Sequence, residues 1–409
     1  MNLAQRIWHE LTRPRGQSKR RYYRGGRQSR SGVALLMVIT SLMFITIIGT
    51  EMTKGGIVRL RLAANQRDEA KAEALAETGF QMYRLILVAS KGMGQQLGPM
   101  LQQFGMTGEL WQMMPFINTG MMRMLLSAGS SPDEDDVEQF AVEGLTDEQI
   151  AESREEGQGT TKRNFLDFDG DFFAEVTDEN SRIYVGAFRA TTYADMLEDP
   201  VALRLYGLMS GVDNDQFFYD QNIDRWELIG NLADWTDVDD MRLYQGGSEI
   251  SVYDRLDEPY RPKNAGFESM SEIRLVDGWH RDDIWEKFGE QLTIYGNGQV
   301  NINSATPEVI SALLRAYVTP NNPDYIRTLL AEISLYQSIS PYTNGQGFVT
   351  HLESLGATVN PELQRAVGTE SNVFHLTSTG QVGEAVVTID AIVDFSNSPI
   401  GEIVYWRIL

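Results

Sequence analysis

Five acidic side chains crowd into a short stretch near the middle of the sequence and are suited to bind a metal ion. They are Asp234, Asp237, Asp239, Asp240 and Glu249, and a Gly246-Gly247 pair precedes the last of them. Carboxylate oxygens are hard ligands, and Ca²⁺ takes about six to eight oxygens in flexible loops. Asp237 and Asp239 are two residues apart, too close to share a helical face, so we expect a loop around an ion. The spacing differs from that of an EF-hand, and a helix cap followed by solvated acids is the alternative.

Catalytic motifs are not apparent in the sequence. The four histidines are scattered, and we find no Gly-x-Ser-x-Gly element, phosphate-binding loop or His-rich metal motif. Acidic pairs are frequent by chance in a chain with 57 Asp and Glu residues. We therefore expect a protein that is not an enzyme. A membrane-tethered periplasmic hydrolase or binding protein is the alternative, and two carboxylates converging in a deep apolar cleft would favour it.

The N-terminal region predicts a membrane anchor. The first 32 residues carry nine basic residues and one acid, and residues 33–50 are uncharged. A helix of 18 residues covers roughly 27 Å, the short end of a bilayer span, and the basic side stays in the cytoplasm. A secretory signal fits poorly because no small-x-small site follows the apolar core. A plain signal anchor is a second interpretation. The third is a cut between Gly32 and Val33, which resembles a type IV prepilin processing site.

Charge and composition exclude several classes of partner. Beyond residue 32 the chain holds 26 basic and 56 acidic residues, a net charge of −30. Such a surface repels phosphate backbones, so we expect no nucleic acid as a partner. The absence of Cys excludes disulfides and thiolate metal sites.

The elements that position these residues predict an α+β fold. Gly55-Gly56 indicates a soft joint, followed by an amphipathic helix to about residue 88. Strands at 172–176 and 182–185 predict a hairpin across polar turn residues, and three further strands lie at the C-terminus. A late antiparallel meander on the early helix would close a pilin-like domain around an inserted, mostly helical domain. The predicted parts are a basic leader (1–32), the transmembrane and amphipathic helix (33–90), a Met-rich and acidic insertion (91–163), the first strands (164–192), the helical domain (193–368) and the last strands (369–409).

Three blocks in the helical region, taken in order with the C-terminal strands, carry a family resemblance. The first is Gly230-Asn231-Leu232-Ala233-Asp234-Trp235-Thr236-Asp237-Val238-Asp239-Asp240, followed by Gly246-Gly247-Ser248-Glu249. The second is Tyr260-Arg261-Pro262-Lys263-Asn264-Ala265, which leads into Glu272-Ile273-Arg274-Leu275-Val276. The third is Val300-Asn301-Ile302-Asn303-Ser304-Ala305-Thr306-Pro307-Glu308-Val309-Ile310. In the last block we expect Ser304 or Asn303 to cap a helix. The ordered set closely resembles the K-type minor pseudopilins of type II secretion systems. The resemblance covers the Gly32-Val33 junction, the span and roughly residues 165–409, but not the Met-rich zone.

That resemblance implies an assembly role. Cleavage after Gly32 by prepilin peptidase and methylation of the Val33 amine are implied. So is a complex with I- and J-type minor pseudopilins at the tip of a pseudopilus built from the major pseudopilin. Met37, at mature position 5, matches the absence there of the usual pilin Glu. The family implies a single-pass protein of the inner membrane of a Gram-negative bacterium with its bulk in the periplasm, and structural Ca²⁺ in the helical domain.

Overall fold

The computed structural model describes residues 31–103, 109–122, 169–186, 188–256 and 258–409. Contacts divide the chain into two compact units, Met1–Ala64 and Asn65–Leu409. Most of the predicted leader and much of the predicted insertion at 91–163 lie outside the described residues.

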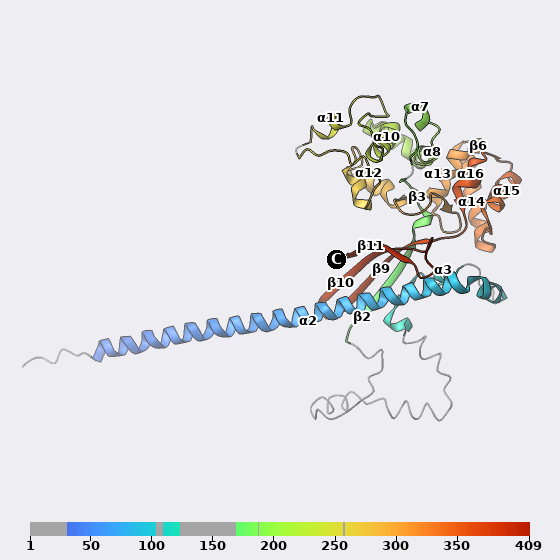
Figure 1. Cartoon of the computed structure of the whole chain (residues 1–409). Coiled ribbons are helices and arrows are strands. Elements are labelled where there is room, and N and C mark those ends of the chain that lie inside the picture. Colours follow the sequence, from blue (N-terminus) through green and yellow to red (C-terminus); the bar gives the residue numbers. More distant parts are fainter. Residues whose placement is uncertain (1–30, 104–108, 123–168, 187, 257) are drawn as a thin grey trace, which may run out of the picture. The chain divides into compact units, whose positions relative to one another are not determined.

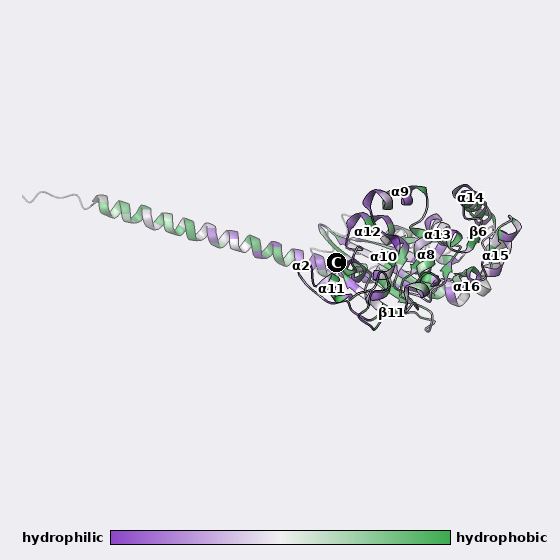
Figure 2. Ribbon diagram, turned by 90° about the horizontal axis from the view of Figure 1, so that it is seen from above, coloured by the Kyte–Doolittle hydropathy of each residue, from purple (hydrophilic) through white to green (hydrophobic). Residues whose placement is uncertain are grey.

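Helix α2 comprises Ser31–Gln103, and its residues belong to both units. Its apolar part is long and apolar enough to cross a membrane by length and composition, with a mean hydropathy of 2.4 over 18 residues (Figure 2). The hydroxyls of Thr46 and Thr50 donate to carbonyl oxygens four residues earlier, at 2.8 and 2.9 Å, so the helix satisfies them internally. The predicted soft joint at Gly55-Gly56 is wrong, because the helix passes through both glycines, and it extends beyond the predicted boundary at residue 90.

A five-stranded antiparallel sheet in the second unit packs on the later part of α2 (Figure 1). The strand order is β1-β2-β9-β10-β11, with bounds β1 (Phe116–Asn118), β2 (Asp171–Asp178), β9 (Val373–Val382), β10 (Ala385–Asp394) and β11 (Glu402–Ile408). Burial alternates along β2, where Phe172 and Ala174 face the core while Asp171 and Phe173 are exposed. The last three strands agree with the sequence expectation. Strand β1 falls within the segment predicted to be an insertion and was not anticipated.

Small residues let helix and sheet approach closely. A Cβ added to Gly380 on β9 would lie 2.0 Å from the carbonyl oxygen of Ala72 on α2, so only glycine fits there. Two residues earlier on β9, the Ser378 hydroxyl donates to the Ala76 carbonyl oxygen at 2.7 Å. The α2 register on the sheet is therefore set by backbone contacts as well as by apolar packing.

The segment between β2 and β9 is mostly helical and has its own apolar core (Figure 1). Close packing of two helices centres on Gly207, where an added Cβ would lie 2.3 Å from the Ala312 carbonyl oxygen. The helices are α7 (Tyr193–Met196), α8 (Pro200–Leu208), α9 (Val212–Gln221), α10 (Arg225–Thr236), α11 (Ile250–Tyr253), α12 (Asp282–Phe288), α13 (Pro307–Tyr317), α14 (Pro323–Ile339), α15 (Gly345–Ser354) and α16 (Glu362–Ala366). Short strands pair between them as β3 (Ile183–Tyr184) with β4 (Leu292–Thr293), β5 (Val300–Asn301) with β8 (Val367–Gly368), and β6 (Val318–Thr319) with β7 (Thr358–Val359). The α+β architecture with a pilin-like helix and sheet and a helical insertion is confirmed.

The predicted hairpin at 172–185 is wrong. Strand β3 pairs in parallel with β4 of the helical region, and β2 pairs with β1 and β9. The polar residues between the two segments are buried instead of solvated. Asp178 is 3% exposed, and its carboxylate accepts hydrogen bonds from the hydroxyls of Ser304 and Ser371 and, at 3.4 Å, from the Asn301 amide. Burial raises the pKa of Asp178 to about 6 although these hydrogen bonds oppose it. This network ties the sheet to the helical region.

A second buried acid, Glu179, lies beside it. The Arg182 guanidinium donates to the Glu179 Oε1 at 2.7 Å, and the Thr293 hydroxyl donates to the Glu179 Oε2. On β9, His375 lies between Glu179 and Asp390, with 3.5 Å from its Nδ1 to the Glu179 Oε1. Burial would lower the pKa of His375, but its hydrogen bonds to the two carboxylates outweigh that effect and raise the pKa to about 9. The imidazole is therefore charged at neutral pH.

Helix α13 is capped by Thr306, the residue directly before Pro307, and not by either of the two residues expected from the sequence. The Thr306 hydroxyl, not Asn303 or Ser304, accepts from the first turn of α13, at the Val309 amide. Ser304 serves the Asp178 network, and the Asn303 amide donates to the Tyr342 carbonyl oxygen at 2.8 Å.

Candidate metal centre

The acidic cluster is formed by the end of α10 and the loop that follows it. Asp224 caps the start of α10 by accepting from the Trp226 amide, and Asp234 lies in the last turn. Asp237 occupies the C-cap position in an extended conformation, so the chain leaves the helix there. The loop then doubles back through an isolated Met241–Ser248 bridge, which brings Glu249 to the end of α10.

Three of the five predicted acids converge. Single carboxylate oxygens of Asp234, Asp237 and Glu249 all lie within 4.8 Å of one another. Glu249 is 1% exposed, and both its oxygens are buried without a hydrogen-bond partner. Asp234 is also buried, and its Oδ1 accepts from the Leu243 amide at 2.9 Å. A buried carboxylate with no hydrogen-bond partner is costly in its charged form.

The pKa values of the three acids reflect this crowding. Burial raises the pKa of Asp234 to about 7, and the charges of Asp237 and Asp239 add to the rise. The pKa of Asp237 rises to about 6 through burial and the Asp239 charge. Burial and four acidic neighbours raise the pKa of Glu249 to about 8. In the absence of a cation, the three carboxylates therefore cannot all ionise at neutral pH without mutual repulsion.

The other two predicted acids play a different local role. Asp239 and Asp240 are exposed, and they lie outside the converging group. The Asp239 Oδ1 accepts from the Met241 amide at 2.8 Å, as in a loop-stabilising turn. The Asp240 Oδ1 accepts from the Asn264 amide at 3.2 Å.

Asn264 is the residue that sequence reasoning did not assign to this site. Its amide nitrogen also donates to the Asp239 carbonyl oxygen at 2.7 Å, while its own Oδ1 is buried without a partner. The residue adopts a φ of 49°, in the left-handed region that Asn tolerates better than most residues. Asn264 belongs to the second of the three sequence blocks, so the sequence singled out its motif. The contact with Asp239 could not be predicted, because the two residues are 25 positions apart in the sequence.

The donor set fits a hard divalent cation. The converging groups are carboxylates, with an unpartnered amide oxygen on the adjoining loop, and oxygen donors of this kind suit Ca²⁺. The buried oxygens of Glu249 are the feature that an ion would satisfy.

The predicted processing residues lie at the start of the first helix. Gly32 and Val33 are in the first turn of α2, and the Val33 side chain is exposed. The apolar stretch follows them directly, as the predicted cleavage requires.

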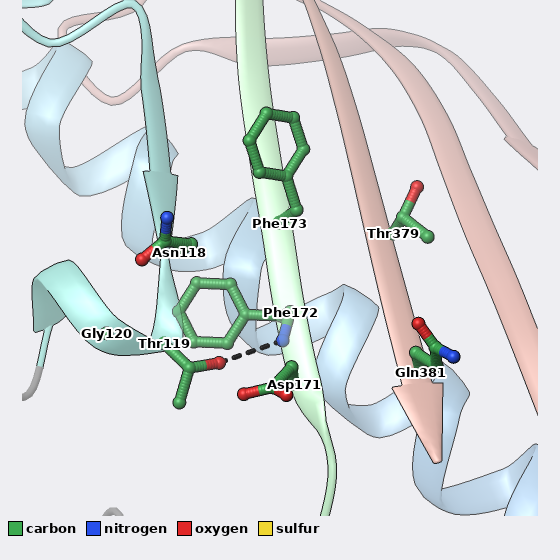
Figure 3. Close-up of a pocket in the computed structure, with 8 residues that line it drawn as sticks. All are labelled: Asn118, Thr119, Gly120, Asp171, Phe172, Phe173, Thr379 and Gln381. Carbon is green, nitrogen blue, oxygen red and sulfur yellow. Dashed lines mark hydrogen bonds between the residues drawn. The ribbon is translucent and has the colours of Figure 1, made fainter. Parts of the chain in front are cut away.

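A pocket lies against the sheet (Figure 3). Its volume is about 350 Å³, and the Thr119 hydroxyl accepts from the Phe172 amide at 2.9 Å within it. Asp171 is the one carboxylate among its lining residues, which are Asn118, Thr119, Gly120, Asp171, Phe172, Phe173, Thr379 and Gln381. The pair of carboxylates that would favour a hydrolase does not occur in this pocket.

Comparison with known proteins identifies the region around the acidic cluster. Residues 213–294 match the family model described as type II secretion system protein K, first domain. Over these residues the chain is similar to the type II secretion system protein K family. The matched segment runs from α9 to β4 and contains all five predicted metal ligands together with Asn264.

Among solved structures, the chain is similar to a chain of the GspK-GspI-GspJ complex from the type 2 secretion system of enterotoxigenic Escherichia coli. The sequence identity is 17%, the match covers 59% of this chain and 80% of that one, and the TM-score is 0.45. No curated protein matches the sequence.

Proposed function

We propose that this protein is a minor pseudopilin at the tip of a type II secretion pseudopilus. It starts pseudopilus assembly together with I- and J-type pseudopilins and so supports export across the outer membrane. The observation that carries the proposal is the combination of a protein K domain with a long helix whose apolar start follows a Gly32-Val33 junction. An apolar helix of this kind anchors a subunit in the inner membrane, and the rest of the chain is then periplasmic.

The residue at mature position 5 supports the tip location. Cleavage after Gly32 makes Val33 the first residue and Met37 the fifth. In other pilins a Glu at this position pairs with the terminal amine of a neighbouring subunit during insertion. A subunit with Met37 makes no such pair, which suits the position above which no further subunit is added. A carboxylate placed there without a partner would cost several kcal/mol in an apolar setting.

We further propose that Ca²⁺ braces the loop between α10 and α11. Asp234, Asp237 and Glu249 would hold the ion, and the buried Asn264 Oδ1 on the adjoining loop is a further oxygen donor without a partner. The bound charge would relieve repulsion among three carboxylates and satisfy the Glu249 oxygens. The role we propose for the ion is structural, because two of its three carboxylate ligands are buried.

Co-expression tests the assembly role. The full chain is produced in membranes with I- and J-type pseudopilins and prepilin peptidase, extracted in mild detergent and measured by native mass spectrometry. We expect one complex containing one copy of each of the three subunits. Pairwise co-expression with the major pseudopilin serves as the specificity control. A K-type chain that remains alone in the presence of both minor pseudopilins would contradict the proposal.

A further inference from the structure

A short basic segment of helix α2 follows the apolar part of that helix. It contains Lys54, Arg59 and Arg61, and no acid occurs between Glu51 and Asp68. This composition is unusual for the chain, which from residue 33 onward has 56 acidic and 26 basic residues. The acids that dominate the rest of the chain are therefore absent from the part of α2 that follows the predicted span.

The three bases of this segment have no acidic partner in the described part of the chain. Each of them is exposed, and none forms an ion pair with another described residue. The next two bases of α2 differ in this respect. Arg67 pairs with Asp68 at 2.8 Å, and Lys71 pairs with Asp169 at 3.3 Å. Unpaired positive charge is thus concentrated in the part of α2 that lies closest to the span.

Helix geometry places the three bases near the lipid headgroups. The uncharged run that ends at Thr50 covers roughly 27 Å, and the hydrocarbon core of a bilayer is roughly 30 Å thick. Lys54 lies roughly 6 Å beyond Thr50 along the helix, and Arg61 lies roughly 17 Å beyond it. Long basic side chains extend back toward the headgroups, and charges interact over a Debye length of about 8–10 Å. All three bases are therefore within electrostatic reach of lipid phosphates.

The arrangement of the bases around α2 favours a layer of headgroups over a partner protein. At 3.6 residues per turn, Arg59 lies about 140° around the helix from Lys54 and about 160° from Arg61. The charges thus occupy opposite sides of the helix, whereas a partner protein covers one side. Ile57 and Leu60 lie between them in the sequence and are 48% and 73% exposed. Apolar and basic side chains mixed in this way suit the membrane boundary, where apolar groups meet acyl chains and charges meet phosphates.

We propose that Lys54, Arg59 and Arg61 bind the phosphate groups of anionic phospholipids on the periplasmic side of the inner membrane. The proposal rests on the orientation given with the proposed function and adds a lipid contact to it. Cleavage after Gly32 would remove the nine basic residues that hold the cytoplasmic end of the span before processing. The mature span then has basic side chains only at its periplasmic end, so this segment sets how deeply the mature helix lies in the bilayer.

Native mass spectrometry in mild detergent tests the proposal. The full chain, produced with prepilin peptidase, is titrated with dioleoylphosphatidylglycerol, which is anionic, and with dioleoylphosphatidylcholine, which is zwitterionic. We expect at least tenfold tighter binding of the anionic lipid. The triple variant Lys54→Gln, Arg59→Gln and Arg61→Gln should lose at least tenfold in affinity for the anionic lipid, because each base near an anionic surface contributes about fivefold.

Two further variants control for net charge and for residue type. Arg255→Gln, Arg327→Gln and Arg365→Gln together remove the same charge from exposed positions of the second unit and should leave the lipid affinity unchanged. Arg59→Lys combined with Arg61→Lys keeps the charge of the segment and should keep its affinity for the anionic lipid. Inorganic phosphate at the lipid concentration should not displace the lipid; displacement would contradict a contact made at the membrane.

Equal affinity of the native chain for the two lipids would overturn the proposal, as would equal binding of the anionic lipid by the native chain and the triple glutamine variant. Complex formation with I- and J-type pseudopilins is measured separately, without added lipid. Failure of the proposed function therefore appears as a missing complex, and failure of the lipid contact appears as missing selectivity. If the triple variant loses the complex but keeps its lipid affinity, the three bases contact an acidic partner subunit and the proposal is wrong.

Discussion

Replacing Glu249 by Gln should have opposite effects on stability with and without calcium. Both oxygens of this side chain are buried without a partner, and the neighbouring acids repel its charge. Glutamine keeps the shape and removes the charge. In the calcium-free protein the substitution therefore relieves a cost, and in the calcium-bound protein it removes a ligand.

The size of the effect follows from the pKa of Glu249. That pKa is about 8 in the ion-free fold against an ordinary value of 4.5, so the folded chain binds more protons than the unfolded chain between these values. This carboxyl therefore lowers the free energy of unfolding as the pH rises through that window, by about 3 kcal/mol at pH 7. Glu249→Gln avoids this loss. Saturation with Ca²⁺ at a thousandfold excess over the dissociation constant stabilises the native chain by about 4 kcal/mol, which is enough to reverse the order.

Chemical denaturation at pH 7 of the full chain in detergent, in chelator and in excess Ca²⁺, measures both effects. Glu332→Gln, an exposed position on α14, is the matched control and should behave as the native chain does. In chelator Glu249→Gln should be the most stable of the three, and in Ca²⁺ the least stable. A variant that is destabilised equally in both conditions would refute the metal assignment, as would a calcium gain that survives the substitution.

Three further outcomes follow from the structure. Intact-mass measurement of membrane-extracted chain should give a mature terminus at Val33 with a methylated amine; a chain still intact in cells with active prepilin peptidase would contradict the processing site. His375→Gln should lower the free energy of unfolding by about 2–3 kcal/mol below pH 6.5, and this difference should shrink as the pH rises through 9. The reason is that the histidine, whose pKa is raised, stabilises the fold only while its imidazole is charged. A pH-independent difference in denaturant titrations would exclude this ion pairing. Gly380→Ala should destabilise the second unit by about 2 kcal/mol or more, since its methyl group meets the Ala72 carbonyl oxygen, whereas Gly347→Ala, with more space, should not; equal unfolding midpoints would show that α2 is not packed as described.

The C-terminal strands and the apolar N-terminal helix could be predicted from the sequence, because each depends on the pattern of neighbouring residues. The alternation of β9 and β10 and the turn residues between them identified the C-terminal strands, and the uncharged run after Gly32 identified the apolar helix. The hairpin prediction failed because the residues around Asp178 and Glu179 have turn composition but are buried by groups more than a hundred residues away. No local pattern reveals such partners.

The acidic cluster shows the same limit at the candidate site. Crowding in the sequence identified Asp234, Asp237 and Glu249, but composition did not separate them from Asp239 and Asp240. Which of the five acids converge depends on where α10 ends and on how the following loop folds back toward the helix. Asn264 joins the loop by a contact that only the fold creates.

Protein secretion by intact cells tests the central proposal most directly. In a strain from which the gene for this chain is deleted, type II substrates should accumulate in the periplasm. The full chain should restore their release into the medium, and a chain lacking residues 33–50 should not. Release at the native level from the deletion strain would contradict a role at the pseudopilus tip.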